Sequence, residues 1–330
     1  MSALTLTAAP VDRPRQTRWL LRLHRPAIYT WAVLWLALVT LLLALDGPLL
    51  NAAADAWRQY ESCTTSGRCS YDQNAILRYK DYYNYATTAL NVLPFVLAAW
   101  AGAALTGREL ESGTARLAWT QATSPAHWLA VRLAVPALGV TVCTGLLAWL
   151  HHRAWTASQG RIENTKEWYD RFTFHAGGPT LAAMALAGLA AGALAGLLLR
   201  RTLPALAVGL VAVGVVRWLT ELAMPHLWPA VTRLSTVDQG FLGKGMVVDQ
   251  GMVTASGAHV PPPTCDYTVP SCATVFDRFT GRYNTYQPQS HLWGAQLTTT
   301  ALTLAVAALL VTGCFLVLRR QTGTLRAARP

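Results

Sequence analysis

Charged residues are scarce in this chain of 330 residues and make up only 13% of it. A soluble domain usually carries about a quarter charged residues. Because 53% of this sequence is hydrophobic, much of its surface has to face something other than water. The sequence also has no phosphate-binding loop of the form G-x-x-x-x-G-K-[ST]; the nearest string, Gly240 to Gly245, has the wrong spacing. These shortages argue against an ordinary soluble domain and against a phosphate-loop nucleotide site in this chain.

Six apolar stretches are long enough to cross a hydrocarbon core of roughly 30 Å, which takes about 20 residues. Each is predicted to be a helix, because a bilayer offers no water to a bare backbone. Five lie within residues 28–222, at 28–45, 87–106, 128–150, 179–199 and from 203 onwards, and the sixth is 297–318. The expected fold is therefore an all-α integral membrane protein with six transmembrane helices. The long basic leader and an apolar core of about 18 residues favour a retained first span over a cleaved signal peptide.

Basic residues are distributed unevenly between the two sets of loops. If both termini lie in the cytoplasm, the inner set holds fourteen basic and three acidic residues, which equals the net charge of +11 of the whole chain. The outer loops hold twelve residues of each sign. This is the positive-inside arrangement, and it predicts a plasma-membrane protein with a cytoplasmic leader (1–27) and tail (319–330). Topology thus explains the basic charge, and no nucleic-acid partner is expected.

The outer segments are expected at 46–86, 151–178 and 223–296, the last forming a small irregular extracellular cap with some strand. Four cysteines lie in these segments, on the oxidising side of the membrane. Their short spacings favour two local disulfides, Cys63 with Cys69 and Cys265 with Cys272, over the other pairings or free thiols. The histidines are scattered, so no metal site is expected.

The leader is predicted to contain an amphipathic helix. Arg15, Arg18, Arg22 and Arg25 recur at steps of three and four, so they line one face, while Trp19 lies on the other. Such a helix lies on the inner leaflet with its cations toward anionic headgroups. This pattern indicates membrane lipids as partners, and it is equally consistent with a simple positive-inside anchor.

The loop between the second and third spans, residues 107–127, is the cytoplasmic segment whose sequence most suggests a function. Its composition favours a helix that ends near Ser124, because Pro125 disfavours helix in the residue before it. Glu109, Glu111 and Arg116 offer charges to a cytoplasmic partner. A solvated linker between two spans would account for the same composition.

This loop contains a long motif that continues into the third span. It reads Arg-Glu-Leu-Glu-x-Gly-Thr-x-Arg-Leu-Ala-Trp-Thr-Gln, followed by Trp-Leu-Ala-x-Arg-Leu. The motif resembles the inner loop of the actinobacterial ATP-binding-cassette (ABC) type-2 permeases, and segments 199–205 and 286–293 are similar to other parts of that family. The resemblance implies an ATPase-coupling role for Arg108, Glu109, Leu110, Glu111, Gly113, Thr114, Arg116, Leu117, Trp119 and Gln121.

The resemblance implies a complex of two permease subunits, as a homodimer or heterodimer, with separate ABC ATPase subunits that bind ATP and Mg²⁺. The loop would be a coupling helix, and the chain would be the permease subunit of an exporter that moves an amphiphilic substrate outward. It would not itself be an enzyme. The alternative is a membrane sensor or scaffold whose outer loops bind a ligand without transport. An ABC importer is a further alternative, although the loop pattern is that of the exporters.

Two features inside the spans have both a structural and a functional interpretation. Gly188, Gly192 and Gly196 allow close approach of another helix, within this subunit or across a dimer. Arg217 and Glu221 are four residues apart, so they either line a substrate path or pair near the outer interface. The first, second, fourth and sixth spans contain no ionisable Asp, Glu, His, Lys or Arg, which argues against a membrane-embedded enzyme.

Overall fold

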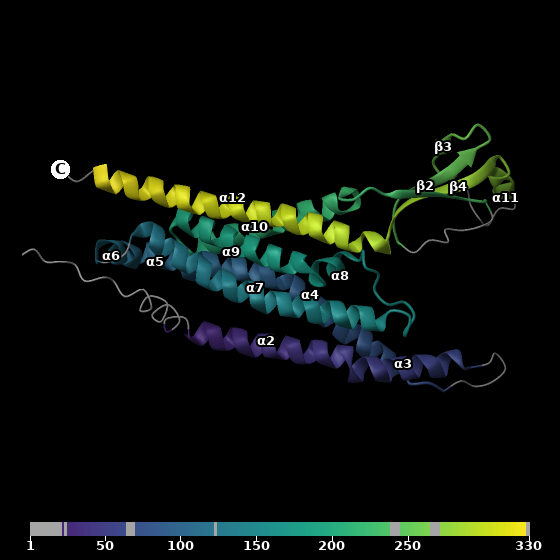
Figure 1. Cartoon of the computed structure of the whole chain (residues 1–330), viewed down its shortest axis with the longest axis horizontal. Helices are drawn as coiled ribbons and strands as arrows, with labels where there is room; N and C mark the ends of the chain where they lie inside the picture. Colours follow the sequence, from purple (N-terminus) through teal and green to yellow (C-terminus); the bar gives the residue numbers. More distant parts are fainter. Residues whose placement is uncertain are drawn as a thin grey trace, which may run out of the picture.

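The protein is a long helical bundle. The computed structural model describes residues 22, 25–63, 70–121, 124–237, 245–264 and 271–327. Within these residues, six helices are long and apolar enough to cross a membrane. They run side by side, with a β-sheet at one end of the bundle (the sheet end) and the short helix α6 at the other (the α6 end) (Figure 1). The predicted all-α integral membrane fold with six spans is thereby confirmed.

The six helices are α2 (Arg25–Asp46), α4 (Gln73–Trp100), α7 (Pro125–Ser158), α9 (Pro179–Leu199), α10 (Thr202–Ala223) and α12 (Leu292–Ala327). Four of the six, α2, α4, α7 and α12, are longer than the spans predicted from hydropathy, whereas α9 matches its predicted span. Two shorter helices, α3 (Pro48–Glu61) and α8 (Arg171–Ala176), lie in segments expected to be loops. Helix continues there because α3 and the first turns of α4 bury apolar residues in one shared core, including Ala53 and Ile76.

Helix α9 lies at the centre of the bundle and packs against α4, α7, α10 and α12. Its three spaced glycines make this possible. A Cβ added at Gly188 or Gly192 would collide with the carbonyl of Pro94 or Ala98 on α4, and one at Gly196 would collide with the Thr106 hydroxyl. The glycine motif therefore packs helices within one subunit, as small residues do in membrane proteins.

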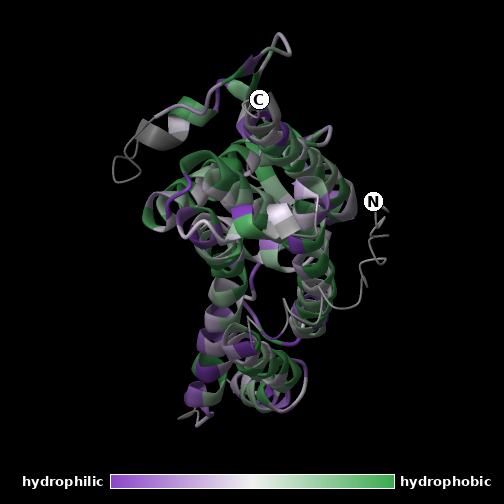
Figure 2. Cartoon of the chain, turned by 90° about the vertical axis from the view of Figure 1, so that its left-hand side faces the viewer, coloured by the Kyte–Doolittle hydropathy of each residue, from purple (hydrophilic) through white to green (hydrophobic). Residues whose placement is uncertain are grey.

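The outward faces of the bundle are strongly apolar. Leu138 on α7, Leu203 on α10 and Leu309 on α12 are each at least 70% exposed. Figure 2, which looks from the α6 end, shows hydrophobic residues over the outer sides of the helices. An apolar surface of this extent suits contact with lipid tails, which solvate apolar side chains as well as a protein core does.

The segment between α10 and α12 forms a four-stranded antiparallel sheet of order β1-β4-β2-β3. The strands are β1 (Val231–Ser235), β2 (Gly245–Thr254), β3 (His259–Val260) and β4 (Phe279–Pro288), with a short helix α11 (Ser271–Phe276) before β4. The strand expected near Gly245 is confirmed. The expectation of an irregular cap is corrected, because β4 pairs along its length with β1 on one side and β2 on the other.

Some predicted features lie outside the described residues. The amphipathic leader falls almost entirely within residues 1–24, of which the structure describes only Arg22. Cys63 is disulfide-bonded, but Cys69 and Cys265 lie outside the described residues. The pairings of Cys63 with Cys69 and of Cys265 with Cys272 remain predictions.

Candidate functional site

The chain reaches the predicted coupling loop through an unusual helical turn. After α4, residues Ala101–Gly107 form a π-helix, η1, which leads into α5 (Arg108–Glu111). π-Helical turns are rare overall, and those that occur are often found at functional sites. A Cβ added at Gly107 would collide with the carbonyl of Gly102 and press on the backbone of Thr202. Glycine therefore allows η1 to pass close to the first residue of α10.

The loop contains two short helices instead of the single helix predicted from its composition. α5 ends at Glu111, and α6 (Thr114–Gln121) starts after a bend at Ser112 and Gly113. Gly113 has a φ of +75°, a left-handed conformation that glycine adopts without steric penalty. The Thr114 hydroxyl closes the bend by donating to the Glu109 carbonyl at 3.2 Å. We call this helix–bend–helix unit, residues 108–121, the elbow.

A buried ion pair fixes the elbow to α7. Both carboxylate oxygens of Glu109 accept hydrogen bonds from the guanidinium of Arg132. The two side chains are only 11% and 8% exposed. Charge-assisted bonds of this kind are strong and directional. Glu109 therefore points into the protein, and this carboxylate is used to position α5.

Aromatic packing extends the same connection to α6. The Arg132 guanidinium lies 4.4 Å from the ring centre of Trp128. Trp128 in turn meets Trp119 of α6 edge to face, with ring centres 5.5 Å apart. Such cation–π and aromatic contacts each add attraction beyond burial alone. Both helices of the elbow are therefore attached to the first two turns of α7.

A second attachment joins the elbow to α10. The Glu111 carboxylate accepts hydrogen bonds from the backbone N–H of Thr202, at 2.9 Å, and from the Thr202 hydroxyl. Thr202 is the first residue of α10, where backbone N–H groups lack helical partners and the helix dipole favours negative charge. Glu111 thus caps α10 from another helix.

The far side of the elbow is open. Arg108, Arg116 and Thr120 are exposed, and Leu117 is 58% exposed even though it is a large apolar residue. Behind them, Ala115 is fully buried in a small core formed with α7, α9 and α12. The elbow thus has one face packed on the spanning helices and one face, with Arg116 and Leu117 at its centre, free within the described chain.

The ten predicted coupling residues accordingly fall into separate groups. Glu109, Leu110 and Trp119 pack inward, and Glu111 is held by α10. Gly113 makes the bend. Arg108, Thr114, Arg116 and Leu117 are exposed, and the side chain of Gln121 lies outside the described part of the chain. Which of them touches an ATPase stays a prediction.

Sequence reasoning did not identify the internal partners Arg132, Trp128 and Thr202. One signal was available: Arg132 is a lone arginine at the start of an apolar span, and a charge in that position usually requires an opposite charge nearby. No comparable signal linked Glu111 to Thr202, because 91 residues separate them.

The intramembrane pair Arg217 and Glu221 lies toward the sheet end. The Arg217 guanidinium donates to the Glu221 carboxylate at 2.6 Å and to the Arg171 carbonyl, the first residue of α8, at 3.2 Å. The pair therefore connects α10 to α8. A role in a substrate path remains a prediction.

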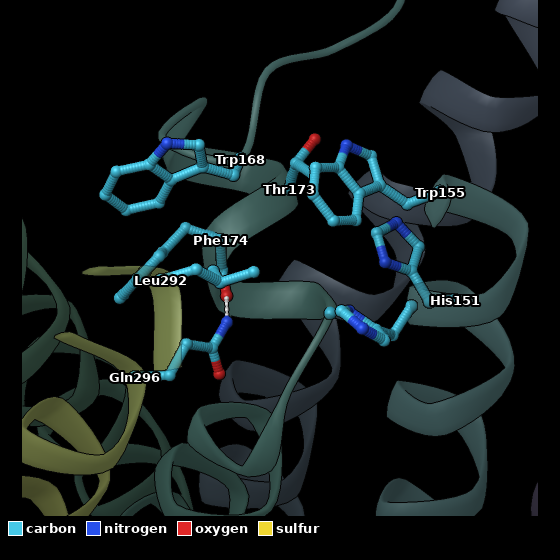
Figure 3. A pocket seen from close by; sticks show the side chains of 9 residues that line it. His151, Trp155, Trp168, Thr173, Phe174, Leu292 and Gln296 are labelled. Carbon is cyan, nitrogen blue, oxygen red and sulfur yellow. Dashed lines mark hydrogen bonds between the residues drawn. The ribbon is translucent and has the colours of Figure 1, made fainter. Parts of the chain in front are cut away.

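The sheet end of the bundle also contains a small cavity of about 10 Å³ (Figure 3). It lies among α7, α8 and α12, where the Gln296 amide donates to the Phe174 carbonyl at 2.7 Å. His151 Nδ1 and Thr173 Oγ1 line it without hydrogen-bond partners among the described residues. A cavity of this size has room for at most about one water.

The contacts of the elbow position it against the spanning helices α7 and α10. Among the described residues, no three His, Cys, Asp or Glu side chains lie close enough together to hold a metal ion. Six apolar helices of membrane-spanning length, joined to an elbow that is fixed on one face and open on the other, define a multi-pass membrane protein.

Comparison with known families names the class more closely. The family model "ABC-2 membrane transporter related" matches residues 33–224, which is more than half of the chain and includes the elbow. The chain belongs to this family, whose members are membrane components of ABC transporters that work with ABC ATPases. No curated protein and no solved structure matches it significantly.

Proposed function

We propose that the chain is the permease subunit of an ABC exporter and that the elbow is where its ATPase partner docks. The observation that supports this is the two-faced build of the elbow. Its inner face is fixed to α7 through Glu109 and Arg132 and to α10 through Glu111. Its outer face presents Arg116 and Leu117. A force applied to that outer face would reach two spanning helices directly.

The distribution of charge supports a cytoplasmic position for the α6 end. The start of α2, the α9–α10 turn, the elbow and the last part of α12 carry Arg25, Arg108, Arg116, Arg200, Arg201, Arg319 and Arg320. Basic residues concentrate on the cytoplasmic side of membrane proteins. With this orientation, the elbow faces the cytoplasm, where ATP and Mg²⁺ are available to an ATPase. The β-sheet then lies on the extracellular side of the plasma membrane.

We further propose that two such permease subunits pair in the membrane and move an amphiphile outward between or along their helices. Apolar outer faces on α10 and α12 leave ample surface for a second subunit. A transported substrate that raises the ATPase rate of the reconstituted complex would distinguish transport from sensing.

The test is affinity purification of the tagged chain from native membranes in mild detergent, with mass spectrometry of the proteins that co-elute. Wild type is compared with an Arg116→Glu, Leu117→Asp variant, which changes the open face and leaves Glu109 and Glu111 intact. Arg25→Glu, at the same end but on α2, is the matched control.

We expect an ATPase to co-elute in stoichiometric amount with wild type and with Arg25→Glu, and to be lost from the elbow variant. Unfolding midpoints of all three proteins check that the fold is kept. If no ATPase co-elutes with wild type, under conditions that keep a known ABC transporter intact, the proposal is overturned and a sensor or scaffold becomes the better explanation.

A further inference from the structure

A separate pocket of about 70 Å³ lies at the sheet end, far from the elbow, between the first turns of α4 and the segment that follows α7. Its walls include Tyr79 and Tyr83. Both of these side chains are buried, whereas Tyr82 and Tyr85 on the same helix are exposed. The lining residues are Tyr79, Lys80, Tyr83, Asn84, Ser158, Asn164, Thr165 and Lys166.

The charge of this pocket is unusual for this chain. The sequence contains 24 arginines and only three lysines, yet two of the three lysines, Lys80 and Lys166, line this one pocket. None of its lining residues is acidic. Both lysine and arginine bind phosphate groups. Lysine does so through a compact ammonium charge, whereas arginine forms bidentate hydrogen bonds.

The two ammonium groups are poorly neutralised. Lys80 is half-buried and makes no ion pair among the described residues. Lys166 is paired with Asp170 at 3.5 Å, a long contact between partly exposed groups. Partly burying a charge without a partner is unfavourable. An anion placed between the lysines would offset that cost.

The wall that carries Lys166 is held in place. The Lys166 carbonyl accepts hydrogen bonds from the Trp155 indole at 2.7 Å and from the Gln159 amide at 3.3 Å. Asn164 takes a left-handed φ of 55°, which turns the chain back toward α4. The opposite wall is α4 itself. Both lysines are thus presented by fixed backbone, which reduces the entropy lost on binding.

We propose that this pocket binds a phosphate-type oxyanion, held by the ammonium groups of Lys80 and Lys166 with the Asn84 amide at its mouth. The cavity is seven times larger than the water-sized one near His151, which suits a small headgroup and not acyl chains. The first apolar turns of α4 begin a few residues further along, so the pocket lies at the level of lipid headgroups. The oxyanion belongs either to a phospholipid or to a small soluble phosphate ester.

The experiment uses the purified full-length chain and two probes. Native mass spectrometry measures retention of phosphatidylglycerol, with phosphatidylcholine as the zwitterionic comparison. Calorimetry measures binding of glycerol phosphate. The variants are Lys80→Gln with Lys166→Gln, and Arg78→Gln as the control, an exposed charge on the same helix that does not line the pocket.

We expect binding to weaken about tenfold or more in the double variant, because it loses two charge-assisted hydrogen bonds, and to stay unchanged in Arg78→Gln. Weakened phosphatidylglycerol retention alone assigns the site to lipid, and weakened glycerol phosphate binding assigns it to a soluble ester. The Lys166→Gln single variant repeats the test at an exposed side chain if the double variant is unstable. The proposal is overturned if neither probe binds wild type, or if all variants bind alike. Neither result depends on ATPase docking.

Discussion

The ion pair between Glu109 and Arg132 gives the sharpest test of how the elbow is held. Glu109→Gln leaves the guanidinium of Arg132, only 8% exposed, beside a neutral amide. Removing one partner of a buried pair typically costs about 3–5 kcal/mol, because the other charge is left uncompensated. For a protein of 330 residues, that corresponds to a fall in the unfolding midpoint of roughly 4 to 7 °C.

The double variant Glu109→Leu, Arg132→Met separates the charge effect from packing. Replacing both members of a buried pair by apolar residues is often close to neutral. A residual loss of about 1–2 kcal/mol is expected from the missing contact between Arg132 and Trp128, because both side chains are buried. The midpoint of the double variant should therefore lie well above that of Glu109→Gln.

Unfolding midpoints in detergent, followed by tryptophan fluorescence, measure both effects. ATPase co-elution measured on the same samples shows whether the elbow must be attached to α7 in order to dock. If Glu109→Gln unfolds within about 2 °C of wild type, the pair does not hold the elbow and the reasoning fails.

Three further predictions rest on other parts of the bundle. Gly192→Ala should prevent stable folding, because the added Cβ would collide with the Ala98 carbonyl. The control Gly145→Ala should fold normally, because its added Cβ meets open space. Yield and gel-filtration elution volume of the two variants test the prediction. Gly113→Ala should cost about 1 kcal/mol through its left-handed φ and weaken ATPase co-elution more than it lowers the unfolding midpoint. Burial, and secondarily the charge of Arg217, hold the pKa of His175 well below its usual value. The unfolded state therefore binds the proton more readily, and the stability of the fold should decrease as pH drops below about 6.5. His175→Leu should make this decrease smaller. Unfolding midpoints measured between about pH 7.5 and 5.5 test the prediction, and the same pH dependence in wild type and variant would contradict it.

Hydropathy was enough to predict the six spans, because a bilayer constrains the length and polarity of the helices that cross it. The same reasoning ended α7 too early, at residue 150. α7 continues to Ser158 because Ala154 and Trp155 remain buried against neighbouring helices. Tertiary packing, which hydropathy does not report, sets that end.

The elbow shows a different limit. Its motif indicated a coupling segment, yet the roles of individual residues depended on partners distant in sequence. Glu109 and Glu111 are two residues apart and look equivalent as exposed acids, but one is buried against α7 and the other caps α10. The bend at Gly113 was also missed, because a single glycine inside a helical pattern can be tolerated.

The central position of α9 has a consequence for biogenesis. α9 is synthesised before α10 and α12, the two helices that cover much of its surface. Until α12 has entered the bilayer, part of the small-residue surface of α9 faces lipid and is open to any other helix with a matching groove. Chains truncated before Leu292 are therefore expected to associate with one another or with foreign membrane proteins, and to be substrates for membrane quality control.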